Sequence, residues 1–269
     1  MRKAQILQQL NNQKFVKIIS GIDNFDLDKV GQVVRAATVA GASGVDVAAR
    51  QDIVQLARQT THLPVFASSI NPQDLALAVA NGADVAEIGN FDALYKAGNF
   101  LTYSDVLSLT EQTLSLVTRD ALVCVTIPGF LPMEAQIRLA QAVEVLGVAM
   151  IQTEGINKEI TSNNRMLAEM SATDKANASF KCTAELVHAV NIPVMTASGI
   201  SSQNATEAFE YGASAIGVGS AVNRLMMEDT MVEEILRIVT RVNNFTPLPM
   251  LEIEATENNT NELVYSSVA

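Results

Sequence analysis

Eight short apolar runs rich in β-branched residues recur along the chain, separated by segments with the periodicity of amphipathic helices. They predict strands at Lys17–Ile22, Gly44–Ala48, Pro64–Ser68, Val85–Asn90, Leu122–Pro128, Val148–Glu154, Pro193–Ser198 and Ala215–Gly219. Helices are predicted at Leu27–Ala40, Gln51–Thr61, Pro72–Asn81, Ser104–Thr118, Pro132–Leu146, Thr183–Val190, Ser202–Tyr211 and Met231–Val242. Strands that alternate with helices are typical of a parallel sheet, and eight such units predict an α/β fold of the (β/α)8 type, a TIM barrel.

An internal repeat supports this fold. Residues 37–48, 78–89 and 209–219 each run from a helix end through a Gly and a small residue into a predicted strand. In each copy the Gly is predicted to end its helix in the left-handed conformation, which residues with a side chain disfavour.

Charge and cysteine content exclude several classes of function. A formal net charge of −11 and a pI of about 4.6 argue against binding to nucleic acid or to an anionic membrane surface. No apolar run reaches the length of a membrane span, and residues 1–13 lack the apolar core of a signal peptide. Two cysteines, Cys124 and Cys182, do not make a disulfide framework, which favours a reducing compartment and a cytoplasmic location.

A single domain is predicted to occupy most of the chain. The barrel is expected over residues 1–243, with an extra N-terminal helix at Met1–Gln13 that closes the barrel floor. From Asn244 onward the chain contains Pro, several Glu and an Asn-rich run, with no Lys or Arg. This composition predicts a flexible acidic tail over residues 244–269.

The clearest candidate site lies at the ends of the last two predicted strands, just before a short predicted helix. Glycines there let a ligand approach the backbone closely, and backbone N–H groups at such turns favour an anion. TIM barrels commonly bind phosphate at this place. We predict a phosphate-binding site formed by Ser198, Gly199, Ile200, Gly219 and Ser220. The alternative is that these glycines only permit tight turns between strand and helix.

Four residues are candidates for catalysis: Lys17, Asp46, Glu87 and Glu154. In one interpretation, Lys17 has a pKa lowered by burial and performs Schiff-base or proton chemistry, with Glu87 or Glu154 as general acid or base. In the other, Lys17 and the carboxylates form a buried charged layer that fills the barrel, because a buried carboxylate must be paired. No metal site is predicted, since the chain shows no zinc-like spacing of ligands.

Several blocks of sequence resemble one known family. They are V-K-I-I-S-G-I-D-N-F-D, A-E-I-G-N-F-D-A-L-Y, A-M-I-Q-T-E-G, T-A-S-G-I-S and G-V-G-S-A, in this order. Over about residues 3–243 the chain resembles the hypothetical chloroplast open reading frame 23 family of cyanobacteria and plastids. The resemblance implies a TIM barrel located in cyanobacterial cytoplasm or plastid stroma. Because that family has no established reaction, the resemblance implies no catalytic residues.

Three functions are compatible with these features. The first is an enzyme acting on a small phosphorylated metabolite, as an isomerase, epimerase or aldolase-like lyase. The second is an oxidoreductase that uses FMN, which is itself a phosphate ester. The third is a metabolite-binding or regulatory protein without catalysis. The expected partner is a phosphorylated small molecule, and homo-oligomerisation is expected only by analogy with other TIM barrels.

Overall fold

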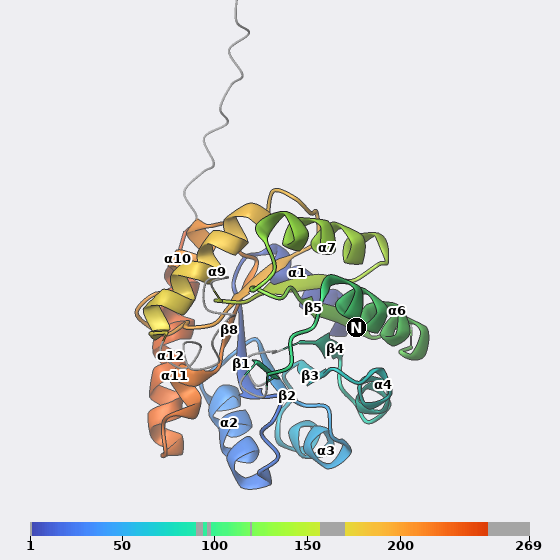
Figure 1. Ribbon diagram of the computed structural model, residues 1–269. Coiled ribbons are helices and arrows are strands. Elements are labelled where there is room, and N and C mark those ends of the chain that lie inside the picture. Colours follow the sequence, from blue (N-terminus) through green and yellow to red (C-terminus); the bar gives the residue numbers. More distant parts are fainter. Residues whose placement is uncertain (1, 90–93, 96–97, 119, 157–169, 247–269) are drawn as a thin grey trace, which may run out of the picture.

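The computed structural model describes residues 2–89, 94–95, 98–118, 120–156 and 170–246. Parallel strands close into a barrel in sequence order, and β8 pairs with β1 (Figure 1). The strands are β1 (Phe15–Gly21), β2 (Gly44–Ala48), β3 (Val65–Ser69), β4 (Val85–Ile88), β5 (Leu122–Thr126), β6 (Met150–Thr153), β7 (Val194–Ala197) and β8 (Ala215–Val218). The predicted TIM barrel and its eight strands are confirmed.

Helices surround the barrel on the outside (Figure 1). They are α1 (Arg2–Asn11), α2 (Leu27–Val39), α3 (Gln51–Thr60), α4 (Pro72–Ala80), α6 (Tyr103–Leu116), α7 (Met133–Val145), α9 (Ala172–Leu186), α10 (Glu207–Glu210), α11 (Ser220–Asn223) and α12 (Glu228–Asn244). Within the described ranges, no helix combines the length and the apolar character needed to cross a membrane.

Local sequence signals set where helices begin and end. The Asp26 carboxylate accepts hydrogen bonds from the backbone N–H groups at the start of α2. Gly41, Gly82 and Gly212 have φ values of +73°, +108° and +88°, and each follows the end of a helix. The left-handed conformation predicted for the Gly of each repeat is therefore confirmed.

The N-terminal helix α1 closes the floor of the barrel, as predicted. Ile6 and Leu10 are fully buried on its inner face. They belong to one cluster with barrel residues near the N-terminal ends of the strands: Phe15, Phe66, Val85, Leu122, Cys124, Met150, Met195 and Ala215. The apolar face of α1 thus keeps water from this end of the barrel interior.

Two helix predictions are wrong in extent. Helix α9 begins at Ala172, about three turns before the predicted start at Thr183. Helix α10 spans only Glu207–Glu210, and the residues from 202 to 206 form turns instead. Helix α12 ends at Asn244. Residues 247–269 of the predicted tail lie outside the described residues, so the tail remains a prediction.

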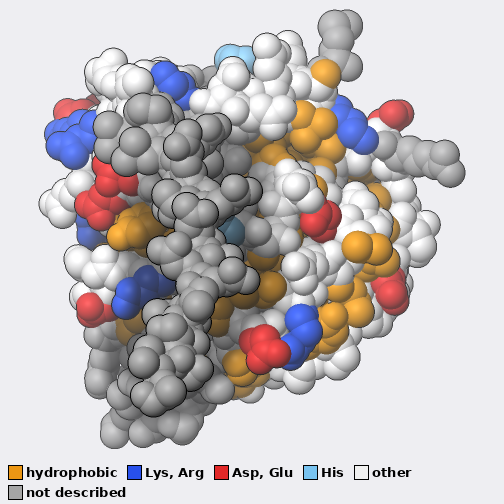
Figure 2. Space-filling view, turned by 90° about the horizontal axis from the view of Figure 1, so that it is seen from above, with side chains coloured by type: hydrophobic (Ala, Val, Ile, Leu, Met, Phe, Trp, Pro, Cys, Tyr) orange, Lys and Arg blue, Asp and Glu red, His pale blue; other side chains and the backbone are white. Residues whose placement is uncertain are grey.

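Charged side chains on the surface lie in mixed pairs. Arg138 pairs with Glu134 at 2.6 Å within α7, and Arg35 of α2 pairs with Glu228 of α12 at 2.8 Å. On the face shown in Figure 2, described Lys and Arg side chains lie singly, several beside Asp or Glu, and form no basic patch. Exposed pairs of this kind each contribute at most about 1 kcal/mol to stability.

The first and last strands meet along one seam of the barrel. Ile18 of β1 pairs with Val218 of β8. Just above this pair, the Asn223 side-chain amide donates hydrogen bonds to the carbonyl oxygens of Ile19 and Ser20, at 2.9 and 3.2 Å. The end of α11 is therefore fastened to the end of β1, and the two together form one wall of the cavity described next.

Candidate phosphate-binding site

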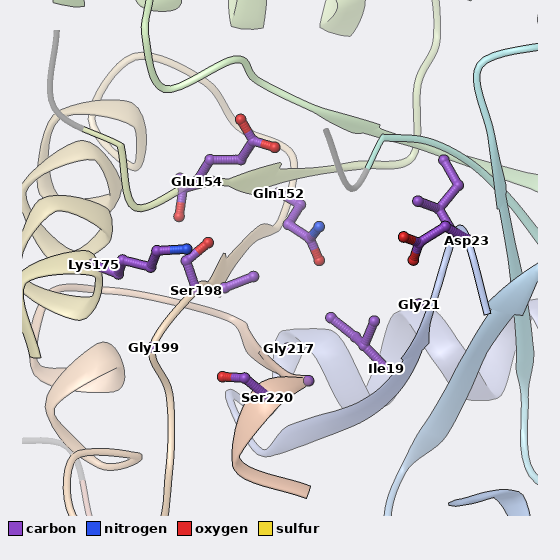
Figure 3. A pocket seen from close by; sticks show the side chains of 14 residues that line it. Ile19, Gly21, Asp23, Gln152, Glu154, Lys175, Ser198, Gly199, Gly217 and Ser220 are labelled. Carbon is purple, nitrogen blue, oxygen red and sulfur yellow. The ribbon is translucent and has the colours of Figure 1, made fainter. Parts of the chain in front are cut away.

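A cavity of about 250 Å³ lies at the C-terminal ends of β1, β6, β7 and β8 (Figure 3). Its walls are Ile19, Gly21, Ile22, Asp23, Gln152, Thr153, Glu154, Lys175, Ala197, Ser198, Gly199, Gly217, Gly219 and Ser220. This is the end of a TIM barrel at which ligands bind. The structure thus brings four of the five predicted phosphate-binding residues to one cavity, together with Glu154.

The turn after β7 has an unusual backbone. Ser198 and Gly199 have φ values of +78° and +72°, both in the left-handed region. A Cβ on Gly199 would lie 2.0 Å from the carbonyl oxygen of Ala172, so the turn packs directly on the backbone of α9. The Asn204 side chain holds the turn by donating to the Gly199 carbonyl oxygen at 3.1 Å and accepting from the Ser201 N–H at 2.9 Å. A left-handed serine is rare and is maintained only by such surroundings.

The end of β8 supplies two glycines with different roles. A Cβ on Gly217 would lie 2.9 Å from Ile19 Cδ1 and 3.2 Å from Gln152 Oε1, so Gly217 makes room for these side chains. At Gly219 the nearest atom to an added Cβ would be Ile19 Cβ at 3.7 Å, an ordinary van der Waals contact, so this position has room for a Cβ. Gly219 therefore leaves the cavity accessible beside Ser220.

Backbone donors at these turns are available to a ligand. Within the described part of the chain, the N–H groups of Gly199, Ile200 and Ser220 donate to no protein acceptor. The Ile200 side chain is buried in the hydrophobic core, so only its backbone takes part. Converging backbone N–H groups of this kind form anion-binding sites.

Lys175, which was not among the predicted site residues, lies in the first turn of α9 and lines the cavity. Its ammonium group points toward the Ser198 hydroxyl (Figure 3). A Cβ on Gly155 would lie 2.0 Å from the Lys175 carbonyl oxygen, so the chain after β6 packs against this turn of α9. The capping pattern of Ser171 and Asp174 marks the start of α9 and is the signal that predicts this helix.

Glu154 lies at the wall of the cavity and is held from two directions. The Tyr95 hydroxyl donates to Glu154 Oε2 at 2.7 Å, and the Gly129 N–H donates to the same oxygen at 3.3 Å. The Tyr95 ring is fixed in turn by stacking on Phe100 and by edge contact with Phe130. The Glu154 carboxylate is therefore kept in one position: the residue is only 4% exposed, and its carboxylate points away from Ser198 (Figure 3).

The other three catalytic candidates lie in the barrel interior and do not line the cavity. Lys17, Asp46 and Glu87 are fully buried. Lys17 forms an ion pair with Glu87, and Asp46 accepts a hydrogen bond from the Ser68 hydroxyl at 2.6 Å. Burial lowers the pKa of Lys17, but the carboxylates of Glu87 and Asp46 raise it by more, so the net shift is upward. Lys17 is consequently a cation at neutral pH.

Gln152 connects this buried layer to the cavity. Its amide nitrogen donates to Glu87 Oε1 at 3.1 Å and to Thr126 Oγ1 at 3.2 Å. The amide group projects from β6 into the cavity (Figure 3). The carboxylate of Glu87 thus fixes the orientation of a side chain that a ligand would contact.

We expect neither cysteine to react with an alkylating reagent in the folded protein. Burial raises the pKa of the Cys124 thiol well above its usual range and the pKa of Cys182 to about 11. Since the thiolate is the nucleophile, only about one Cys182 side chain in ten thousand is reactive at pH 7. Intact-mass measurement after iodoacetamide treatment should show both thiols modified in urea and neither in buffer. Rapid modification of the folded protein would contradict this expectation.

Comparison with known proteins identifies the family. A family model described as "Protein of unknown function (DUF561)" matches residues 1–247. The chain belongs to this family. The uncharacterized protein ycf23 of Cyanophora paradoxa is 38% identical over 242 residues, covering 89% of this chain and 97% of the relative. Its counterpart in Antithamnion sp. is 35% identical over 232 residues, with coverage of 84% and 83%. This agrees with the family that the sequence blocks resemble.

Solved structures similar to this DUF561 protein are TIM barrels. The (S)-3-O-geranylgeranylglyceryl phosphate synthase of Thermoplasma acidophilum, in complex with sn-glycerol-1-phosphate, has a TM-score of 0.61 at 14% identity, covering 88% of this chain and 96% of that one. The 3-hexulose-6-phosphate synthase of Salmonella typhimurium has a TM-score of 0.58 at 15% identity, with coverage of 85% and 99%. At these identities the similarity shows the fold, and the names of both proteins refer to phosphate esters.

Proposed function

We propose that this protein binds a small phosphorylated metabolite, with the phosphate seated against the turns after β7 and β8. The observation that carries the proposal is that Lys175, Ser198, Gly199 and Ser220 line one cavity, and that the backbone N–H groups of Gly199 and Ser220 donate to no acceptor among the described residues. Positive charge and N–H donors together are what a phosphate requires. In this proposal the protein works in the cyanobacterial cytoplasm or the plastid stroma, as the family resemblance implies.

Proton transfer is the chemistry that the cavity supports best, and we assign it to Glu154. A carboxylate at the wall of the cavity, fixed by Tyr95 and Gly129, is the described group best suited to take a proton from a carbon next to a carbonyl group. Returning that proton to the neighbouring carbon, while the hydroxyl proton moves to the former carbonyl oxygen, completes an isomerase reaction without another reactant, whereas an epimerase reaction requires the proton to return to the opposite face of the same carbon. In this proposal Glu87 acts through Gln152, whose amide it orients toward the substrate, and Lys17 acts on Glu87 through their ion pair.

A flavin oxidoreductase is a second candidate, because FMN carries a phosphate group that the same turns would hold. The cavity volume of about 250 Å³ favours a smaller ligand, since sites for drug-sized molecules occupy about 300–1,000 Å³. An absorbance spectrum distinguishes the two: a flavin band in the purified protein, or one retained after adding FMN and removing the excess, would favour the oxidoreductase.

Replacing Gly219 with Asp is expected to weaken phosphate binding by at least about 100-fold, because it places a carboxylate beside the bound anion. An added Cβ at Gly219 would lie no closer than 3.7 Å to any neighbouring atom, so the fold should be retained. Titration with inorganic phosphate, followed by ³¹P NMR, measures the effect, and circular dichroism checks the fold.

Gly219→Ala is the matched control, because it adds a Cβ without charge. It should change phosphate affinity much less than Gly219→Asp. Equal affinity for phosphate in the wild type and in Gly219→Asp would refute the proposed site. Turnover of a phosphorylated metabolite would establish an enzyme, and saturable binding without turnover would indicate the regulatory alternative.

A further inference from the structure

A second cavity, of about 320 Å³, lies between the start of α9, the turn after β7, α11 and α12. Its walls are Ala172, Thr173, Gly199, Ile200, Ser201, Ser202, Gln203, Asn204, Ser220, Ala221, Arg224, Glu234 and Arg237. Gly199 and Ser220 line both this cavity and the first one. A phosphate seated against these two residues would therefore border the second cavity as well.

The charged side chains that line the second cavity differ in whether another protein group pairs with them. Glu234 accepts hydrogen bonds from the Ser202 N–H and hydroxyl, both at 3.0 Å. Arg237 pairs with Glu233 at 3.3 Å and with Glu234 at 3.5 Å. Among the residues that the structure describes, the Arg224 side chain forms neither an ion pair nor a hydrogen bond. Of the cations that line this cavity, Arg224 is thus the one whose charge no described group balances by contact.

Arg224 is also placed within reach of the proposed phosphate site. Its backbone N–H donates to the Ser220 carbonyl oxygen at 3.3 Å, so the two residues are one helical turn apart. One turn rises about 5.4 Å, a distance that the long arginine side chain spans easily. A guanidinium group binds phosphate oxygens through parallel hydrogen bonds.

We propose that the ligand is a diphosphate ester. Its first phosphate lies against Gly199 and Ser220, and its second phosphate enters the second cavity and is bound by Arg224. This inference rests on the proposed function and specifies its ligand. It also gives a role to the second cavity, which the binding of a single phosphate leaves unused.

Comparison of inorganic phosphate with pyrophosphate tests this inference by isothermal titration calorimetry. Arg224→Gln is expected to weaken pyrophosphate binding by at least about fivefold and to leave phosphate binding within about twofold. Arg138→Gln on α7 is the matched control, because it removes the same charge far from both cavities. It should alter neither affinity.

The outcomes separate this inference from the proposed function. If Arg224→Gln leaves pyrophosphate affinity unchanged, or weakens both anions equally, the diphosphate inference fails while phosphate binding stands. If the wild-type protein binds neither anion, and Gly219→Asp has no effect, the proposed function itself fails.

Discussion

Replacing Lys17 with Met is expected to lower the free energy of unfolding by about 3–5 kcal/mol. The change leaves Glu87 and Asp46 fully buried without the cation that both of them face. It also removes the contact of the Lys17 ammonium group with the Phe66 ring, whose centroid lies 4.9 Å away. Urea denaturation at pH 7 measures the loss.

A double variant keeps this expectation testable. Lys17→Met combined with Glu87→Gln removes a buried negative charge together with the positive one, so it should be more stable than Lys17→Met alone. Interacting residues give non-additive effects of this kind. If the effects of the two changes on the free energy of unfolding simply add, Lys17 and Glu87 do not stabilise each other.

The contribution of Lys17 to the free energy of unfolding should not depend on pH near neutrality. Its pKa is raised in the folded protein above the ordinary value of 10.5. Its contribution is therefore complete below that value and is lost only as the pH rises through the folded-state pKa. The difference in stability between the wild type and Lys17→Met should stay constant from about pH 7 to pH 9, as far as Lys17 itself is concerned.

Replacing Gly199 with Ala is expected to cost about 2–4 kcal/mol of stability and to abolish phosphate binding. The added Cβ would lie 2.0 Å from the Ala172 carbonyl oxygen and 2.8 Å from the Ala176 backbone nitrogen. Because both are backbone atoms, the start of α9 must move away from the turn. That movement displaces Lys175, and the donors of the site no longer converge.

Gly41→Ala is the matched control for this change. Gly41 has nearly the same φ, +73° against +72°, but no atom lies within 4 Å of its added Cβ. It should cost only the conformational strain, about 1 kcal/mol, and leave phosphate binding unchanged. Thermal unfolding and phosphate titration compare the two variants, and equal destabilisation would show that the contact with α9 does not matter.

The barrel could be predicted from the sequence because its strands and most helices carry strong local signals. The repeated Gly at helix ends and the apolar strands each predict one repeat unit, and eight such units leave closure as the simplest arrangement. Burial of the α1 face was predictable for the same reason, since its apolar residues recur at helical spacing.

The start of α9 was not predicted because hydroxyl side chains interrupt its buried apolar face. Thr153 lies 2.7 Å from the Ser179 hydroxyl, and Thr183 lies 2.6 Å from the Thr196 hydroxyl. Hydroxyl groups bonded in pairs replace the apolar residues that reveal a buried helix face. The error hid Lys175, so the predicted phosphate site lacked its cation.

The pairing partners of the buried charged residues also could not be predicted from the sequence. Lys17, Asp46 and Glu87 were recognisable as charges within apolar strands, but their pairing depends on the register of β1, β2 and β4 around the barrel. The same register places these three charged residues beneath the cavity. It also lets Gln152 contact Glu87 while it lines the cavity.

The pairing of β1 with β8 determines when the cavity can form during synthesis on the ribosome. Ile19 and Gly21 lie on one side of the cavity at the ends of the strands, and Gly219 and Ser220, from much later in the chain, lie on the other. During synthesis the ribosome releases the first pair long before the second exists. A growing chain therefore lacks this cavity until its last strand has emerged and closed the barrel, and the proposed ligand would stabilise only the completed molecule.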